Sequence, residues 1–206
     1  MNLGLFSKSA PAPETLPIFP LSTVLFPGGI LMLKIFEPRY MDMSKVCLRD
    51  NRPFGVCLIK EGNEVGGPAV PEEIGCTAEI IEWDMQQLGV LHLKTEGVRR
   101  FRILGRQVAK DGLISAEVVM LGAELETPLA SDLRQCATVL KLIMEKIGEE
   151  HFPAPAKLDD ATWVSYRLAE VLPLKLAAKQ KMLEINDSVV RLQVLHKFLV
   201  QQGLVA

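Results

Sequence analysis

The sequence predicts an α+β fold in which a curved, partly closed β-sheet with one helix precedes an α-helical bundle. Up to about residue 122, apolar and polar residues alternate in short runs that end at glycine, asparagine or aspartate. This pattern is typical of β-strands joined by turns. After Pro128, apolar residues recur every three or four positions instead, which is the period of helices that bury one face.

The first part of the chain, residues 16–40, predicts a strand, a turn, a second strand and the start of a helix. Prolines 17, 20, 27 and 38 lack a backbone donor and should limit regular structure to short pieces. Phe26-Pro27-Gly28-Gly29 fits a turn with positive φ at its third residue. The preceding residues 1–15 are predicted to be a flexible tail, because their proline, serine and alanine content is linker-like.

The remaining elements follow from periodicity and from helix caps. One helix is expected from Pro38 to Leu48, and its apolar residues lie on one face. The alternating runs predict strands over residues 54–59, 76–83, 90–94, 98–104 and 113–121. Four later helices are predicted over residues 129–147, 160–172, 174–185 and 188–202. Asp159-Asp160 and Asn186-Asp187-Ser188 supply caps for two of them, and Gly203 should end the last.

Composition excludes several classes of function. The chain has 206 residues, 49% of them hydrophobic, and a net charge of −2 with no strongly basic segment, so nucleic acid is an unfavourable partner. Cysteines 47, 57, 76 and 136 form no C-x-x-C pair and are expected to be buried free thiols. No metal or cofactor motif is present, and the longest apolar run is too short to span a membrane. A cytoplasmic location is therefore expected.

Several segments in succession resemble the amino-terminal, substrate-binding domain family of Lon proteases. They are residues 16–40, 54–60, 74–80, 95–103, 166–174 and 179–192. The fourth contains Gly97-Val98-Arg99-Arg100-Phe101, which is similar to the family's Gly-x-x-Arg-Phe segment, and the fifth contains the Leu-Ala-x-x-Leu-Pro signature. Each motif alone is modest, but their order along the chain is specific. Cereblon contains the same module.

The resemblance implies a PUA-like, six-stranded β domain over residues 16–122 and a helical bundle over residues 123–206. It also implies a non-catalytic protein that recognises exposed or unfolded polypeptide, and it leaves open whether a separate ATP-dependent protease is a partner. The sequence contains no Gly-x-x-x-x-Gly-Lys-Ser/Thr, the motif whose backbone and lysine hold nucleotide phosphates. ATP hydrolysis and proteolysis are therefore not inferred. The oligomeric state is not predicted.

Two sets of residues are candidates for contact with a polypeptide partner. Glu37, Arg39 and Tyr40 place an ion pair and an aromatic ring at the start of the first helix, although fold specification alone could explain them. Trp163 and Arg167 lie on a predicted helix that could border a groove between the two parts of the chain. Packing in the core is the alternative explanation for Trp163.

Arg99, Arg100 and Arg102 form the densest cationic group and are the candidate anion-binding residues. They support a second hypothesis, RNA binding through the sheet, in which they would contact phosphates. Neutralisation by Glu79, Glu82 or Glu96 is the alternative. A third hypothesis is a hydrolase that uses Ser131 or Ser165 with a lysine, although no catalytic motif surrounds either serine.

Overall fold

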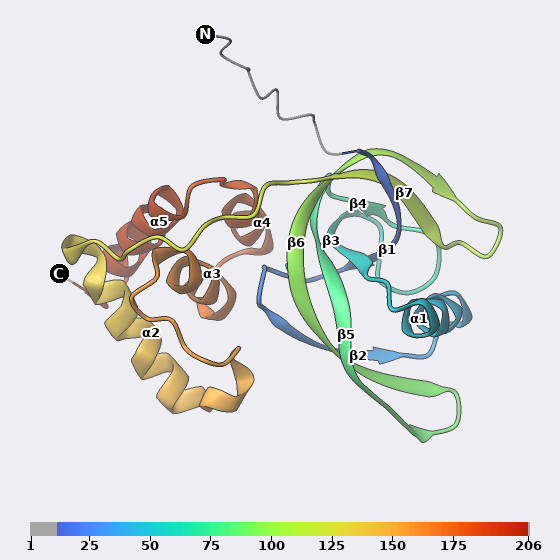
Figure 1. The fold of residues 1–206 in the computed structure, drawn as a ribbon, viewed down its shortest axis with the longest axis horizontal. Coiled ribbons are helices and arrows are strands. Elements are labelled where there is room, and N and C mark those ends of the chain that lie inside the picture. The colour runs from blue at the N-terminus through green and yellow to red at the C-terminus, as the bar shows by residue number, and fades with distance from the viewer. Residues whose placement is uncertain (1–11, 206) are drawn as a thin grey trace, which may run out of the picture.

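The structure, a computed structural model that describes residues 12–205, places a β-barrel beside an α-helical bundle (Figure 1). The barrel part contains β1 (Glu14–Leu21), β2 (Ile30–Ile35), α1 (Pro38–Asp50), β3 (Phe54–Glu61), β4 (Val70–Pro71), β5 (Ile74–Gln87), β6 (Val90–Val108) and β7 (Ile114–Met120). The bundle contains η1 (Ser131–Leu133), α2 (Arg134–Ile147), η2 (Glu149–His151), α3 (Ala161–Val171), α4 (Leu176–Glu184) and α5 (Ser188–Gln201). The predicted fold class and the order of its two parts are confirmed.

Five strands close the barrel in the order β1, β7, β6, β5, β3 and back to β1. The β1–β3 pair is parallel and the other pairs in this ring are antiparallel. β2 pairs with residues 91–96 of β6, and the short β4 pairs with β3. The described sheet therefore has seven strands, one more than the resemblance implied.

β1 is longer than its prolines predicted. It runs for eight residues and includes Pro17 and Pro20. Its first half pairs with β7 and its second half with β3, and the two pairings overlap only at Ile18. Most of β1 thus has one neighbour at a time, as an edge strand does, and edge strands tolerate a missing donor. β1 also takes in Glu14 and Thr15 from the predicted tail, whose residues 1–11 lie outside the described part of the chain.

The turn at Phe26 is confirmed and packs against β6. Gly29 donates to the Phe26 carbonyl at 2.9 Å, and Gly28 has a φ of 72°. Gly97 of β6 donates to the Gly29 carbonyl at 2.8 Å. A Cβ atom on Gly97 would lie 2.2 Å from the Phe26 carbonyl oxygen, so only glycine allows this approach. Gly97 also lies inside the strand, which makes β6 one continuous element where the sequence predicted two.

The predicted helix caps are confirmed. The Asp160 carboxylate accepts hydrogen bonds from the backbone N–H groups of Thr162 and Trp163 at the start of α3. Asp187 does the same for Val189 and Val190 at the start of α5. These contacts fix where both helices begin, and therefore fix which side chains each helix turns toward the barrel.

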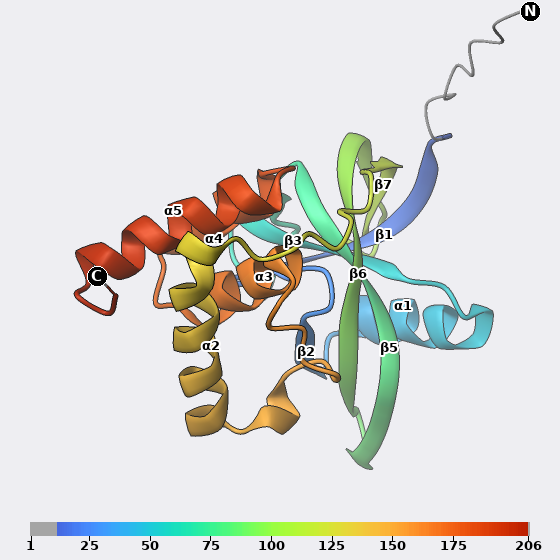
Figure 2. The same cartoon turned by 60° about the vertical axis from the view of Figure 1, so that its left-hand side comes forward.

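The barrel and the bundle have separate apolar cores that meet at the Phe26 turn. Ile18, Phe101 and Val118 belong to the barrel interior, and α1 covers a second cluster on the outside of the sheet. Phe26 instead belongs to the bundle core, where its ring centroid lies 5.7 Å from that of Tyr166. Figure 2 shows the β5–β6 hairpin between α1 on one side and the bundle on the other.

Candidate functional site at the junction of barrel and bundle

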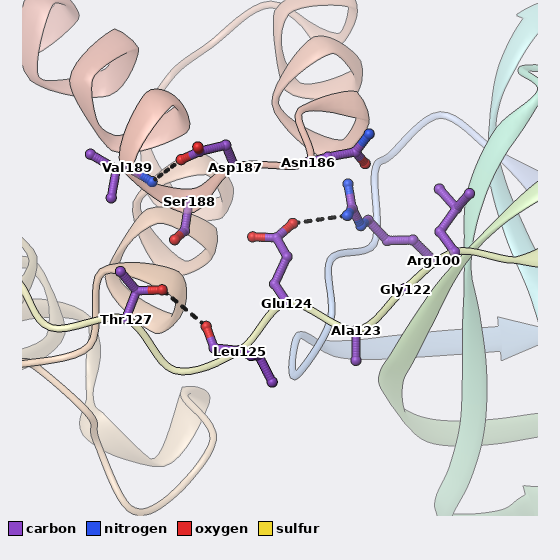
Figure 3. Close-up of a pocket in the computed structure, with 11 residues that line it drawn as sticks. Arg100, Gly122, Ala123, Glu124, Leu125, Thr127, Asn186, Asp187, Ser188 and Val189 are labelled. Atoms are coloured by element: carbon purple, nitrogen blue, oxygen red, sulfur yellow. Dashed lines mark hydrogen bonds and ion pairs between the residues drawn. The ribbon is translucent and has the colours of Figure 1, made fainter. Parts of the chain in front are cut away.

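Residues 121–127, the crossing segment, leave the barrel after β7 and run across to the bundle. Two cavities lie along this segment. The linker cavity, of about 570 Å³, is shown in Figure 3 and is lined by Arg100, residues 121–125, Thr127 and residues 186–189. The junction groove, of about 270 Å³, shares Arg100 and residues 121–124 and adds Pro27, Val98, Arg99, Glu126, Lys157, Asp160, Thr162, Trp163 and Tyr166.

Arg100 and Glu124, which line both cavities, belong to a buried ion cluster. The Glu124 carboxylate lies 2.9 Å from Nη2 of Arg100 and accepts hydrogen bonds from Nη1 and Nη2 of Arg191 at 3.0 and 2.5 Å. The Tyr166 hydroxyl donates to the same carboxylate at 2.6 Å. Burial raises the pKa of Tyr166, and the nearby Arg191 only partly opposes this. Glu124 therefore has its acceptor positions filled and is not available as a free base.

Two backbone carbonyls satisfy the remaining charge of Arg100. Its Nη1 donates to the carbonyl oxygens of Leu183 at 2.7 Å and Ile185 at 2.8 Å, both at the end of α4. The Arg100 side chain is 3% exposed. Arg100 therefore ties β6 to the bundle, and its guanidinium has no free surface to offer an anion.

Ser165, one of the two serines in the hydrolase hypothesis, is fully buried. Its hydroxyl donates to the Thr162 carbonyl at 3.0 Å and accepts from Nη1 of Arg191 at 2.9 Å. An arginine cannot act as the general base that a serine nucleophile needs. The arrangement around Ser165 is therefore that of a structural hydrogen bond. Ser131 lies at the start of η1 and lines neither cavity.

The junction groove brings together two residues that the sequence singled out separately. Trp163 of α3 and Arg99 of β6 both line it, with Val98 and Pro27 as apolar neighbours. Within residues 12–205, the Arg99 guanidinium makes no hydrogen bond or ion pair, whereas Lys157 at the same groove pairs with Glu126. The groove thus combines apolar residues with an Arg99 guanidinium that has no partner among the described residues, and the Asp160 carboxylate in the same lining caps α3.

Glu37, Arg39 and Tyr40 lie at the start of α1, on the far side of the barrel from the bundle (Figure 1). Arg39 donates to Glu37 at 2.8 Å and to the Gly112 carbonyl at 3.2 Å, and its guanidinium carbon lies 4.7 Å from the centre of the Tyr40 ring. Tyr40 stacks on Phe19 at 3.9 Å. These contacts hold α1 against the β6–β7 turn, and they do not bring this set close to Trp163.

Arg167 lies on the same helix as Trp163, but its side chain is 1% exposed. It donates to the Pro27 carbonyl at 2.8 Å, to the Gly28 carbonyl and to Glu170 at 2.8 Å. Arg167 therefore fixes the Phe26 turn against α3. Of the residues suggested for polypeptide contact, Trp163 is the one that lines the junction groove.

The three clustered arginines have different environments. Arg99 is exposed, Arg100 is buried, and Arg102 is exposed with its Nη1 3.8 Å from Glu73. The acidic partners are therefore not those that the sequence suggested, since Arg100 pairs with Glu124, and Glu82 pairs with Lys94. The RNA hypothesis loses one of the three phosphate contacts on which it depended.

Sequence analysis did not identify Glu124 or Arg191. A signal for Arg191 existed, because it follows Ser188 by three positions and precedes Leu195 by four, so it occupies the apolar face of α5. A charged residue in such a stripe needs a buried partner. No local pattern marks Glu124 as that partner, because it lies 67 residues away on the crossing segment.

The remaining predictions concern thiols, metals and membranes. The four cysteines are free and buried, as expected. Within residues 12–205, no three His, Cys, Asp or Glu side chains gather closely enough to hold a metal ion. None of the described helices has the length and apolar content needed to cross a bilayer.

A closed barrel, followed by a helical bundle, defines a mixed α+β domain. Residues 15–201 match the family described as the ATP-dependent protease La (LON) substrate-binding domain, and the chain belongs to this family.

Solved structures support the same assignment. A Lon N-terminal domain protein from Xanthomonas campestris superposes with a TM-score of 0.76 and 35% identity, covering 89% of this chain and 98% of that one. The N-terminal domain of Mycobacterium avium complex Lon protease superposes with a TM-score of 0.63 at 16% identity, covering 88% and 96% of the two chains. The second likeness shows the shared fold.

Relatives of greater length contain this region as one part. Lon protease from Cytophaga hutchinsonii is 25% identical over 189 residues, which are 87% of this chain and 23% of the relative. Protein cereblon from Danio rerio is 30% identical over 112 residues, which are 52% of this chain and 26% of the relative. The matched residues make up about a quarter of each of these proteins.

Proposed function

We propose that this chain is a non-catalytic recognition protein that binds exposed or unfolded polypeptide in the junction groove. The observation that carries the proposal is the presence of Trp163 and the Arg99 guanidinium, unpaired within residues 12–205, in the lining of one cavity. An indole next to apolar walls accepts an apolar side chain, and a free guanidinium orients a nearby carboxylate or backbone carbonyl.

The size of the groove favours weak binding of short segments. A cavity of about 270 Å³ has room for one or two side chains. Each fully buried aliphatic or aromatic side chain contributes roughly 1.5–3 kcal/mol, from which the ordering of the peptide must be subtracted. Two such side chains give at most about 6 kcal/mol before that subtraction, so dissociation constants of about 0.1 mM or weaker follow. Such affinities suit a protein that samples many unfolded segments.

The proposal of binding without catalysis rests on the polar groups at the junction. Glu124 is held by Arg100 and Arg191, Asp160 caps α3, and Glu126 pairs with Lys157. Cleavage and ATP-driven unfolding would then be supplied by a separate ATP-dependent protease. Family membership supports this partner, because the matched family takes its description from the substrate-binding domain of such a protease.

Peptide arrays test the proposal directly. We expect purified protein at about 1 mM to retain apolar peptides, and we expect Trp163→Ala and Arg99→Ala to weaken retention about tenfold. Arg102→Ala is the matched control, because Arg102 is an exposed arginine on the same strand outside the groove. If no apolar peptide is retained, polypeptide recognition is excluded. If Arg102→Ala weakens binding as much as Arg99→Ala, the groove is not the binding surface.

A further inference from the structure

The outer edge of β2 has no strand paired with it in the described part of the chain. β2 pairs with β6 alone, from Ile30 opposite Glu96 to Ile35 opposite Leu91. In an antiparallel ladder the backbone groups of alternate residues point to opposite sides. The hydrogen bond from Gly97 to the Gly29 carbonyl, at 2.8 Å, sets the phase. The backbone N–H and C=O groups of Leu31, Leu33 and Ile35 therefore point toward β6. Those of Met32 and Lys34 point away from it, toward the open edge.

An apolar cavity lies along this edge. It has a volume of about 210 Å³ and includes the consecutive residues 32–36 in its lining. On the face that carries Leu33 and Ile35, the other walls are Phe19, Leu21 and Tyr40. Val65 of the β3–β4 loop and Phe36 also line it, and both are more than half exposed, at 60% and 53%. The edge thus adjoins a place for apolar side chains on one face only.

Among the charged groups that line the cavity, neither Lys34 nor Glu64 has an oppositely charged partner within the described residues. Glu37 accepts from Arg39, and Glu64 accepts from the backbone N–H of Ser22. Lys34 makes no ion pair with any described residue. Its side chain lies on the opposite face from Leu33 and Ile35, because successive side chains of a strand alternate. An acidic side chain placed opposite Lys34 would neutralise it.

The same lysine argues against a second copy of this chain at the edge. An antiparallel pairing of two β2 strands centred on Lys34 would place the two ammonium groups directly opposite each other. Like charges in that position destabilise a strand pair, and an edge lysine is a common means of preventing self-association. In that register, an acidic residue of another polypeptide is a more favourable neighbour for Lys34 than a second Lys34.

We propose that the outer edge of β2 accepts an extended polypeptide segment as an added antiparallel strand with the pattern apolar–acidic–apolar. The two apolar side chains fill the cavity beside Leu33 and Ile35, and the acidic side chain between them pairs with Lys34. The backbone groups of Met32 and Lys34 supply the hydrogen bonds that make extended peptides bind strand edges. The inference rests on the proposed function in that the ligand is polypeptide, but it uses a surface separate from the junction groove.

The proposal is tested by reversing the charge of one residue in the peptide and of Lys34 in the protein. Two seven-residue peptides of alternating valine and polar residues differ only in a central Glu or Lys. We expect the wild-type protein to prefer the Glu peptide by about two- to tenfold, and Lys34→Glu to reverse the preference. Lys60→Glu, an exposed strand lysine outside this cavity, should leave it unchanged. An unchanged preference in Lys34→Glu would overturn the proposal.

Backbone contact is tested separately by amide hydrogen exchange. Saturating Glu peptide should slow amide hydrogen exchange at Met32 and Lys34. Only every second N–H of the peptide donates to β2, so N-methylation of one alternate set of peptide nitrogens should abolish binding and N-methylation of the other set should not. Unchanged exchange at both amides would overturn strand addition.

Trp163→Ala separates this surface from the junction groove, since it should leave Glu-peptide binding intact. If Trp163→Ala abolishes that binding and Lys34→Glu does not, the edge proposal fails while polypeptide recognition stands. Failure of every peptide to bind excludes both.

Discussion

Arg191 of α5 binds Glu124 of the crossing segment through two hydrogen bonds, of 3.0 and 2.5 Å, and their side chains are 0% and 9% exposed. Because Glu124 also lies 2.9 Å from Arg100 of β6, one carboxylate connects the barrel, the crossing segment and the bundle. The wall of the junction groove therefore depends on this ion cluster.

Replacement of Glu124 by Gln should strongly destabilise the protein. The amide has the same shape but leaves two buried guanidinium groups without a counter-charge, which typically costs about 3–5 kcal/mol. Denaturant unfolding measures the change in free energy. Glu126→Gln is the matched control, because Glu126 pairs with Lys157 on the surface, where their side chains are 69% and 45% exposed. That change should cost at most about 1 kcal/mol. Equal effects of the two changes would show that the cluster does not stabilise the junction.

Gly97→Ala should also destabilise the fold. The new Cβ would lie 2.2 Å from the Phe26 carbonyl oxygen, which is a backbone atom of a turn held by Arg167 and cannot move freely. Forcing the turn away from β6 should cost about 1–3 kcal/mol. Gly105→Ala is the control on the same strand, since nothing lies within 4 Å of its added Cβ. A thermal melt in which Gly105→Ala loses more stability than Gly97→Ala would contradict this account.

The sequence predicted the helices and strands well, and it predicted poorly which residues join the barrel to the bundle. Helix starts depend on side chains within three residues, so Asp160 and Asp187 could be identified as caps without a structure. The contacts that join the two parts connect residues far apart, such as Arg167 and Pro27, which are 140 positions apart. No local period encodes such a pair. Sequence analysis therefore suggested Trp163 and Arg99 separately, and only the fold showed that they line one groove.

The cysteines should be unreactive in the native protein. All four are buried, and burial raises the pKa of Cys57 and Cys76 well above the usual range and that of Cys136 to about 11. Because the thiolate is the reactive form, a thiol reagent at pH 8 should modify the native chain only slowly. In denaturant all four should react within minutes. Rapid modification of Cys57 or Cys76 in the folded protein would show that the barrel core opens readily.

The stability of the contact between the Phe26 turn and α3 should depend on the protonation state of Glu170. Burial raises the pKa of this carboxyl to about 7, although Arg167 and Lys179 oppose the shift. A pKa above the unfolded value of 4.5 means that the folded state holds the proton more tightly than the unfolded state. The contribution of Glu170 to stability is therefore fully present below about pH 4.5 and is lost as the pH rises toward 7.

Glu170→Gln removes this titration and keeps an acceptor for Arg167. The free energy of unfolding of the wild-type protein, relative to that of Glu170→Gln, should fall between pH 4.5 and 7, with a slope of at most about 1.4 kcal/mol per pH unit. Urea unfolding of both proteins across this range measures the difference, in which the other carboxyls cancel. A difference that rises with pH would mean that the Arg167 guanidinium, 2.8 Å from the carboxylate, outweighs burial and keeps Glu170 ionised in the folded protein.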